Sequence, residues 1–215
     1  MPPVRRPYPR FIADSPQESQ PYGRWEERLV ERFAAACKSL ASEAPSPLDP
    51  ETLKWFPERA WGGRVYVPVT GRARDATQDE DGTEALAEYF GWVAFDRGDE
   101  GEPQSLSASA DFTDVTAEDN PEWRIDLNDD VIGRWRGESG RAGAVTLVWG
   151  RPLVRGAVAA TAELDMETVD QEVVSNERFT LVALDALEGY GDDIFLQVKL
   201  WSRRGQELAG ENLYA

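Results

Sequence analysis

The sequence from Trp61 onward consists of short runs in which apolar and polar residues alternate, and turn residues separate these runs. In the run 194–200 the even positions are apolar, while Gln197 and Lys199 lie between them. A period of two is typical of a β-strand with one solvated face. The run 89–95 (YFGWVAF) is apolar on both sides, which predicts a central strand or one covered by the helix.

About ten strands with short connections favour an antiparallel barrel or sandwich. The predicted strands span residues 64–73, 85–97, 104–115, 123–127, 131–137, 144–150, 153–164, 172–184, 194–202 and 206–214.

Residues 23–44 form the one long helix that the sequence predicts. Trp25, Leu29, Phe33 and Cys37 recur at helical spacing and make a single apolar stripe, while charged residues cover the opposite side. We expect the four side chains to be buried together, against the sheet or a partner. The Cys37 thiol is then a packed core group and not a reactive one.

Composition divides the chain into three parts. Residues 1–22 hold six prolines and three arginines, so we expect a disordered, proline-rich basic arm. Residues 23–60 form a helical segment that packs on the sheet, with a second short helix at 50–56 that Asp49 caps. Residues 61–215 form the antiparallel β domain.

The chain has no histidine and only one cysteine, and this excludes many functions. Without histidine there is no Ser-His-Asp or Cys-His nucleophile, and no histidine ligand for zinc, copper, iron or haem. One cysteine forms neither an internal disulfide nor a thiolate metal site. The sequence singles out no catalytic residue, no cofactor-binding residue and no metal ligand. We therefore expect no cofactor and no tight Zn²⁺ site.

The formal net charge of the chain is −17. A surface this acidic repels nucleic acid and anionic lipid. No apolar run approaches the roughly 18 residues of a membrane-spanning helix, and the amino-terminal segment lacks the apolar stretch of a secretion signal. We expect a cytoplasmic protein that binds neither nucleic acid nor membranes.

The segment 132–150 (IGRWRGESGRAGAVTLVWG) combines a glycine-rich stretch with a Gly-x-Trp motif. A phosphate-binding glycine loop leads into a helix, whereas alternating β-branched residues follow Gly143, which predicts a hairpin instead. The stretch GRWRGESG resembles the Gly-x-Trp-x-Gly-x-Gly opening of calycin-type barrels such as nitrobindins and, more loosely, lipocalins. The resemblance covers eight residues and implies a small-molecule-binding barrel. In those families the motif opens the barrel, and nitrobindins bind haem through a histidine that this chain lacks. We interpret the segment as a hairpin that carries a core tryptophan, Trp135.

The acidic stretch DLNDD has the spacing that begins an EF-hand calcium loop, at Asp126, Asn128 and Asp130. The sixth and twelfth positions must be Gly and Glu, but they are Val131 and Gly137, which excludes an EF-hand. A solvated acidic turn and a loose Ca²⁺ or Mg²⁺ site remain as alternatives. Three tryptophans in the predicted strands are expected to lie in the core or to line a ligand pocket: Trp92, Trp135 and Trp149.

Charge is divided between neighbouring segments of the chain. Residues 98–130 contain eleven acidic residues and one arginine, a charge of −10, whereas residues 131–160 contain five arginines and one glutamate, a charge of +4. Opposite charges on neighbouring strands pair across a sheet or between subunits. The predicted interface residues are Arg134, Arg136, Arg141, Arg151 and Arg155.

These patterns predict a non-enzymatic accessory or scaffold protein that acts through protein–protein contacts, with a protein partner or self-association. One alternative is a small-molecule-binding, calycin-like barrel. The other is a histidine-free hydrolase that uses carboxylates. A large apolar cavity favours the barrel, and two carboxylates in a cleft favour the hydrolase.

Overall fold

The computed structural model describes residues 23–40, 46–78, 84–98, 101–136, 142–164, 167–187 and 196–213. These residues form one α-helix, two 3-10 helices and fourteen strands, so the fold is mainly β as predicted. The predicted basic arm, residues 1–22, lies outside the described residues. The helices are η1 (Gly23–Trp25), α1 (Glu26–Ser39) and η2 (Pro50–Thr52).

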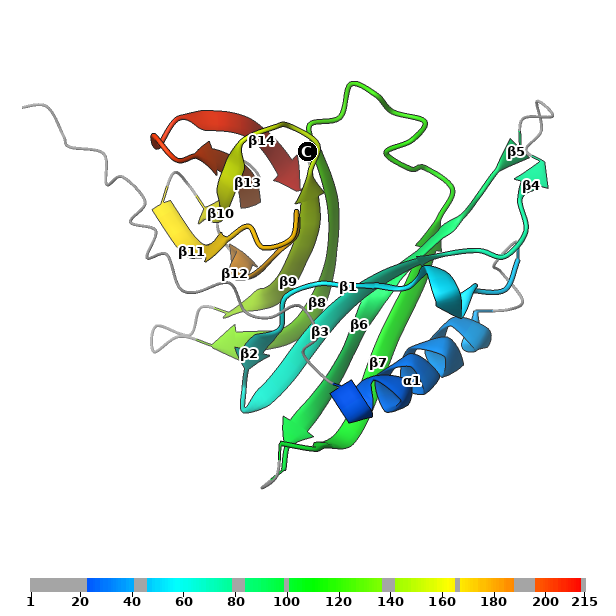
Figure 1. Cartoon of the computed structure of the whole chain (residues 1–215). Helices are drawn as coiled ribbons and strands as arrows, with labels where there is room; N and C mark the ends of the chain where they lie inside the picture. Colours follow the sequence, from blue (N-terminus) through cyan, green and yellow to red (C-terminus); the bar gives the residue numbers. More distant parts are fainter. Residues whose placement is uncertain are drawn as a thin grey trace, which may run out of the picture.

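The described strands form three large antiparallel sheets (Figure 1). The helix-covered sheet contains β1 (Lys54–Trp55), β2 (Arg59–Trp61), β3 (Arg64–Arg72), β6 (Glu88–Arg97) and β7 (Pro103–Thr113). The middle sheet has the order β12 (Phe179–Leu187), β9 (Ala142–Pro152) and β8 (Ile125–Arg136). The outer sheet has the order β11 (Glu167–Val173), β10 (Ala157–Leu164), β13 (Leu196–Ser202) and β14 (Glu207–Leu213). A separate short ladder pairs β4 (Thr77–Gln78) with β5 (Glu84–Ala85).

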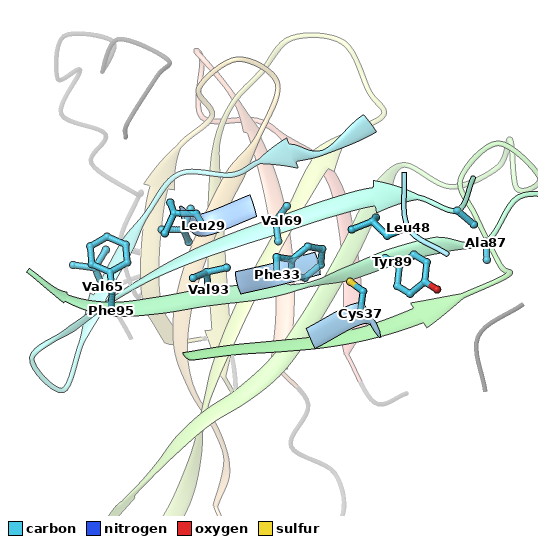
Figure 2. Packing of buried hydrophobic residues seen from close by; sticks show 12 residues of the cluster. Leu29, Phe33, Cys37, Leu48, Val65, Val69, Ala87, Tyr89, Val93 and Phe95 are labelled. Carbon is cyan, nitrogen blue, oxygen red and sulfur yellow. The ribbon is translucent and has the colours of Figure 1, made fainter. Parts of the chain in front are cut away.

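The first core lies between α1 and the helix-covered sheet (Figure 2). Leu29 and Phe33 are fully buried against Val67, Val69 and other residues of β3 and β6. Burial also raises the pKa of the Cys37 thiol to about 12, so the thiol stays protonated near neutral pH. The predicted packing of the apolar stripe against the sheet is confirmed for three positions, while Trp25 packs at the edge and is only partly buried.

Two further hydrophobic cores lie between the sheets, one on each face of the middle sheet. In the first of them, Tyr66 of β3 and Phe56, which follows β1, pack against Trp149 and Leu147 of the middle sheet. The opposite face of the middle sheet packs on the outer sheet through another apolar cluster: Ile125, Val148, Ala160, Ala162, Phe179, Leu181, Ala183, Leu196, Val198, Leu200, Ala209 and Leu213. Alternation along each strand thus gives the middle sheet two buried faces. The predicted central position of β6 is also confirmed, because β3 and β7 flank it.

No sheet formed by the described residues closes into a barrel. β11 lies beside β12, and β14 approaches β8, but no hydrogen-bonded ladder joins either pair among those residues. The barrel alternative is therefore not confirmed, and the stacked sheets are closer to a sandwich.

The predicted count of about ten strands is also not confirmed, because some predicted boundaries differ from the structure. The two strands expected at 123–127 and 131–137 are one bulged strand, β8. The one strand expected at 172–184 is split by a turn in which Asn176 and Glu177 have positive φ. The predicted short helix at 50–56 is only η2, although Asp49 caps it by accepting a hydrogen bond from the Glu51 amide.

An arginine clasp joins the helix-covered sheet to the outer sheet. Arg59 of β2 donates to Glu172 at 2.6 Å and to Asp170 at 2.5 Å, both in β11. Asp170 also accepts a hydrogen bond from the amide of Val182 in β12. The clasp therefore connects strands from all three sheets.

Candidate functional site

Polar side chains of β8 face the helix-covered sheet. The register pairs Asp126 with Arg151, Asn128 with Trp149, and Asp130 with Leu147, and paired residues share a face. Because Trp149 and Leu147 pack toward the helix-covered sheet, the three residues of the DLNDD motif face it too. The motif is therefore part of a strand, and the expected acidic turn is wrong.

The opposite wall of this region belongs to the helix-covered sheet. The register pairs Arg72 of β3 with Glu88 of β6, and Thr70 with Phe90. These four residues share the face of Tyr66 and Ala94, which look toward the middle sheet. The apolar contact between the two sheets thus ends in a row of charged side chains.

The connection between β7 and β8 covers the open end of this row. Its turn is held by hydrogen bonds within the connection: the Asp119 amide donates to the carbonyl of Thr116, and the Thr116 hydroxyl donates to Asp119. The amide of Trp123 donates to the Asn120 carbonyl. Trp123 was expected in a strand, but it precedes β8 and lines the space beneath the connection.

The space enclosed by these elements is a pocket of about 480 Å³. Apart from Trp123, its aromatic lining is Phe90. Six acidic residues and two arginines contribute atoms to the lining of the pocket. They are Glu88, Asp111, Glu118, Asp119, Asp126, Asp129, Arg72 and Arg151.

Both arginines of the pocket already have carboxylate partners. Arg151 donates to the same oxygen of Asp126 from Nε at 2.9 Å and from Nη2 at 2.6 Å. Arg72 pairs with Glu118 of the covering connection. The Asp126–Arg151 pair joins neighbouring strands, which is the kind of contact that the two charge blocks predict. The remaining carboxylates leave the pocket acidic.

Glu88 lines the pocket from β6 and is partly buried. Burial, followed by the negative charge of Asp126, raises its pKa above the ordinary range of a glutamate, while Arg151, Lys54 and Arg72 oppose the shift. Within the described residues, the Glu88 carboxylate has no hydrogen bond and no ion pair. On the adjoining β1, burial lowers the pKa of Lys54, and Arg151 and Arg72 lower it further. Partly buried charged groups of both signs thus lie at this end of the sheet contact.

The structure separates the predicted interface arginines. Arg151 lies in the pocket, whereas Arg134, Arg136 and Arg155 are exposed. Arg141 lies outside the described residues. The role of these arginines in a subunit contact stays a prediction.

The three singled-out tryptophans all lie outside the pocket lining. Trp149 is fully buried, and Trp92 donates from Nε1 to Asp130 at 2.7 Å. The indole nitrogen of Trp135 is buried and has no hydrogen-bond partner among the described residues. The sequence did not single out Glu88 or Trp123, because only strand register and the path of the β7–β8 connection bring them together.

Within the described ranges, no group of three or more Asp, Glu, Cys or His side chains has the arrangement of a metal site. Asp126 and Asp130 of the DLNDD motif are instead held by Arg151 and Trp92. None of the helices in those ranges has the length and apolar character to span a membrane.

Comparison of the chain with protein-family models, with curated protein sequences and with solved structures finds no match. The function is therefore inferred from the residues of the pocket.

Proposed function

We propose that the protein binds a small organic cation, such as an amine or a guanidinium compound, in the pocket between the helix-covered and middle sheets, without catalysis. The excess of acidic residues carries the proposal: six acidic residues and two arginines line the pocket, and both arginines already have carboxylate partners. The volume of about 480 Å³ falls within the range of roughly 300–1,000 Å³ that is typical of small-molecule sites.

The aromatic lining supports a cation as the ligand. Phe90 and Trp123 line the same pocket as the carboxylates. A cation attracted by carboxylates gains further from the face of an aromatic ring, by about 0.5–2 kcal/mol. The exposed apolar side chain of Leu86 lines the same pocket and offers contact to an alkyl chain.

Calorimetry with the full chain tests this proposal. Agmatine and spermidine should bind, whereas succinate and glucose should not. Glu88→Gln and Asp111→Asn should each weaken binding about tenfold or more, because a hydrogen bond to a charged group contributes about 1.5–3 kcal/mol. Glu211→Gln, at an exposed position of β14 that does not line the pocket, is the matched control and should bind as the unaltered chain does. Binding of succinate in preference to the amines would refute the proposal.

Cation binding should weaken as the pH falls through the raised pKa of Glu88. Protonation removes the carboxylate charge that attracts the ligand, and the raised pKa makes this happen at a higher pH than for an ordinary glutamate. The ligand should therefore displace protons from Glu88 in mildly acidic buffer. Calorimetry in two buffers of different ionisation enthalpy measures this release. The Glu88→Gln chain should release fewer protons, and equal release from both chains would exclude Glu88 as the titrating group.

Hydrolysis by carboxylates is the second candidate, and a specific observation favours it. Glu88 has a raised pKa, as a general acid requires, while Asp126 across the pocket is paired with Arg151. Two carboxylates in such different environments can divide the roles of acid and nucleophile. Release of nitrophenol from aryl glycosides, abolished by Glu88→Gln, would decide for hydrolysis over simple binding.

A further inference from the structure

The edge strand β7 is a second feature of the molecule, and the proposed binding of a cation does not use it. β7 ends the helix-covered sheet, and within the described residues it forms a ladder only with β6. Ser105 has a φ of 50° close to a register shift, so the regular part of the edge begins at Leu106. A strand edge of this length presents a row of backbone N–H and C=O groups that another strand can pair with.

This edge lacks the charges that usually protect edge strands. Residues 103–110 (PQSLSASA) contain no charged side chain, although the chain carries a net charge of −17. The other long edges of the described sheets do carry acids, including Glu207 and Glu211 in β14 and Glu167 and Glu172 in β11. Charged side chains on an edge strand discourage pairing with another chain. β7 is therefore the described edge at which a second chain meets the least electrostatic resistance.

A shallow groove runs along the helix side of β7. α1 packs over β7 and β6, and it leaves a groove of about 410 Å³ between the helix and β7. Arg32 is the only charged residue in its lining. The remaining lining residues are small: Ala35, Ala36, Ser39, Ala108, Ser109 and Ala110. A strand added to β7 would point every second side chain into this groove, and short side chains suit it best.

We infer that β7 pairs antiparallel with β7 of a second copy of this chain, which makes one continuous sheet across a two-fold axis. The strand that fits the edge is uncharged and has short side chains opposite the groove. β7 itself has Ala108 and Ala110 at the centre of its helix side, with Leu106 and Phe112 at the two ends. Pairing centred near Ala108 sets Asp111 opposite residues 103–105, so that like charges do not face each other. A two-fold axis makes the contact self-complementary and closed.

Sedimentation equilibrium of the full chain tests this dimer. The unaltered protein should have a mass of about 48 kDa, twice the 24.0 kDa of one chain. The double variant Ser107→Lys, Ser109→Lys adds charge to the edge and should sediment as the monomer with an unchanged circular dichroism spectrum. Asn212→Lys adds one positive charge to an exposed position on the edge strand β14, and this control should remain a dimer.

Three results would overturn the inference: a monomeric unaltered chain, a dimer that survives both lysines in β7, or loss of the dimer in the Asn212→Lys control. Hydrogen exchange of the unaltered chain gives a second measurement that does not depend on the variant folding. Those amides of residues 106–113 that do not bond to β6 should exchange faster when the protein is diluted below the dissociation constant of the dimer. Equal exchange at high and low concentration would place any dimer contact elsewhere.

Discussion

Phe33→Ala should lower the free energy of unfolding by about 3–5 kcal/mol, the range measured for buried phenylalanines. Phe33 is fully buried in the centre of the contact between α1 and the helix-covered sheet (Figure 2). Its truncation leaves a cavity that the neighbouring side chains fill only in part. Guanidinium denaturation followed by tryptophan fluorescence measures the change.

Glu31→Ala on the exposed side of the same helix is the matched control for Phe33. Surface substitutions of this kind change stability by no more than about 0.5 kcal/mol. A denaturation midpoint that Phe33→Ala leaves unchanged would contradict the core assignment of α1.

Gly91→Ala should destabilise the protein by about 2–4 kcal/mol through backbone strain and overpacking. A Cβ atom at this position of β6 would lie 2.1 Å from the carbonyl oxygen of Ser109 in β7, and the φ of 156° is one that side chains rarely adopt. Because the clash is with backbone, a rotamer change offers no relief, and β7 itself must move away.

Gly210→Ala in β14 is the control for Gly91. The nearest atom to its added Cβ is a flexible side-chain oxygen of Glu207 at 3.4 Å, so the cost should stay below about 1 kcal/mol. Thermal unfolding of both variants gives the comparison. If the two substitutions lower the melting temperature equally, β6 and β7 do not approach each other as closely as the structure shows.

The sequence predicted the helix and most strands because both depend on local periodicity. The stripe through Leu29, Phe33 and Cys37 needs no knowledge of the partner sheet, since helical spacing alone aligns the three side chains. The same holds for the alternation in β13, whose Leu196 and Val198 face the core between the middle and outer sheets, as predicted. The strand boundaries near residues 123–137 and 172–184 were wrong because a bulge and a positive-φ turn leave no clear mark in hydropathy.

The candidate site was much harder to predict than the fold. Glu88 and Asp126 are 38 positions apart, and with 40 acidic residues their spacing carries no signal. They face one another only because β6 and β8 belong to different sheets that stack. Their pairing is a property of tertiary packing, which a single sequence does not encode in any local pattern.

The arginine clasp forms only after most of the chain has been synthesised. The carboxylates that hold Arg59 follow it by 111 and 113 residues. Ribosomes add about 5–20 residues per second, so β2 waits about 6 to 23 s before Asp170 and Glu172 exist. During that interval the acidic strand β8 is made before the strands that cover its other face. Contacts of such long range also slow the search for the native topology, so the chain should fold over milliseconds to seconds rather than microseconds.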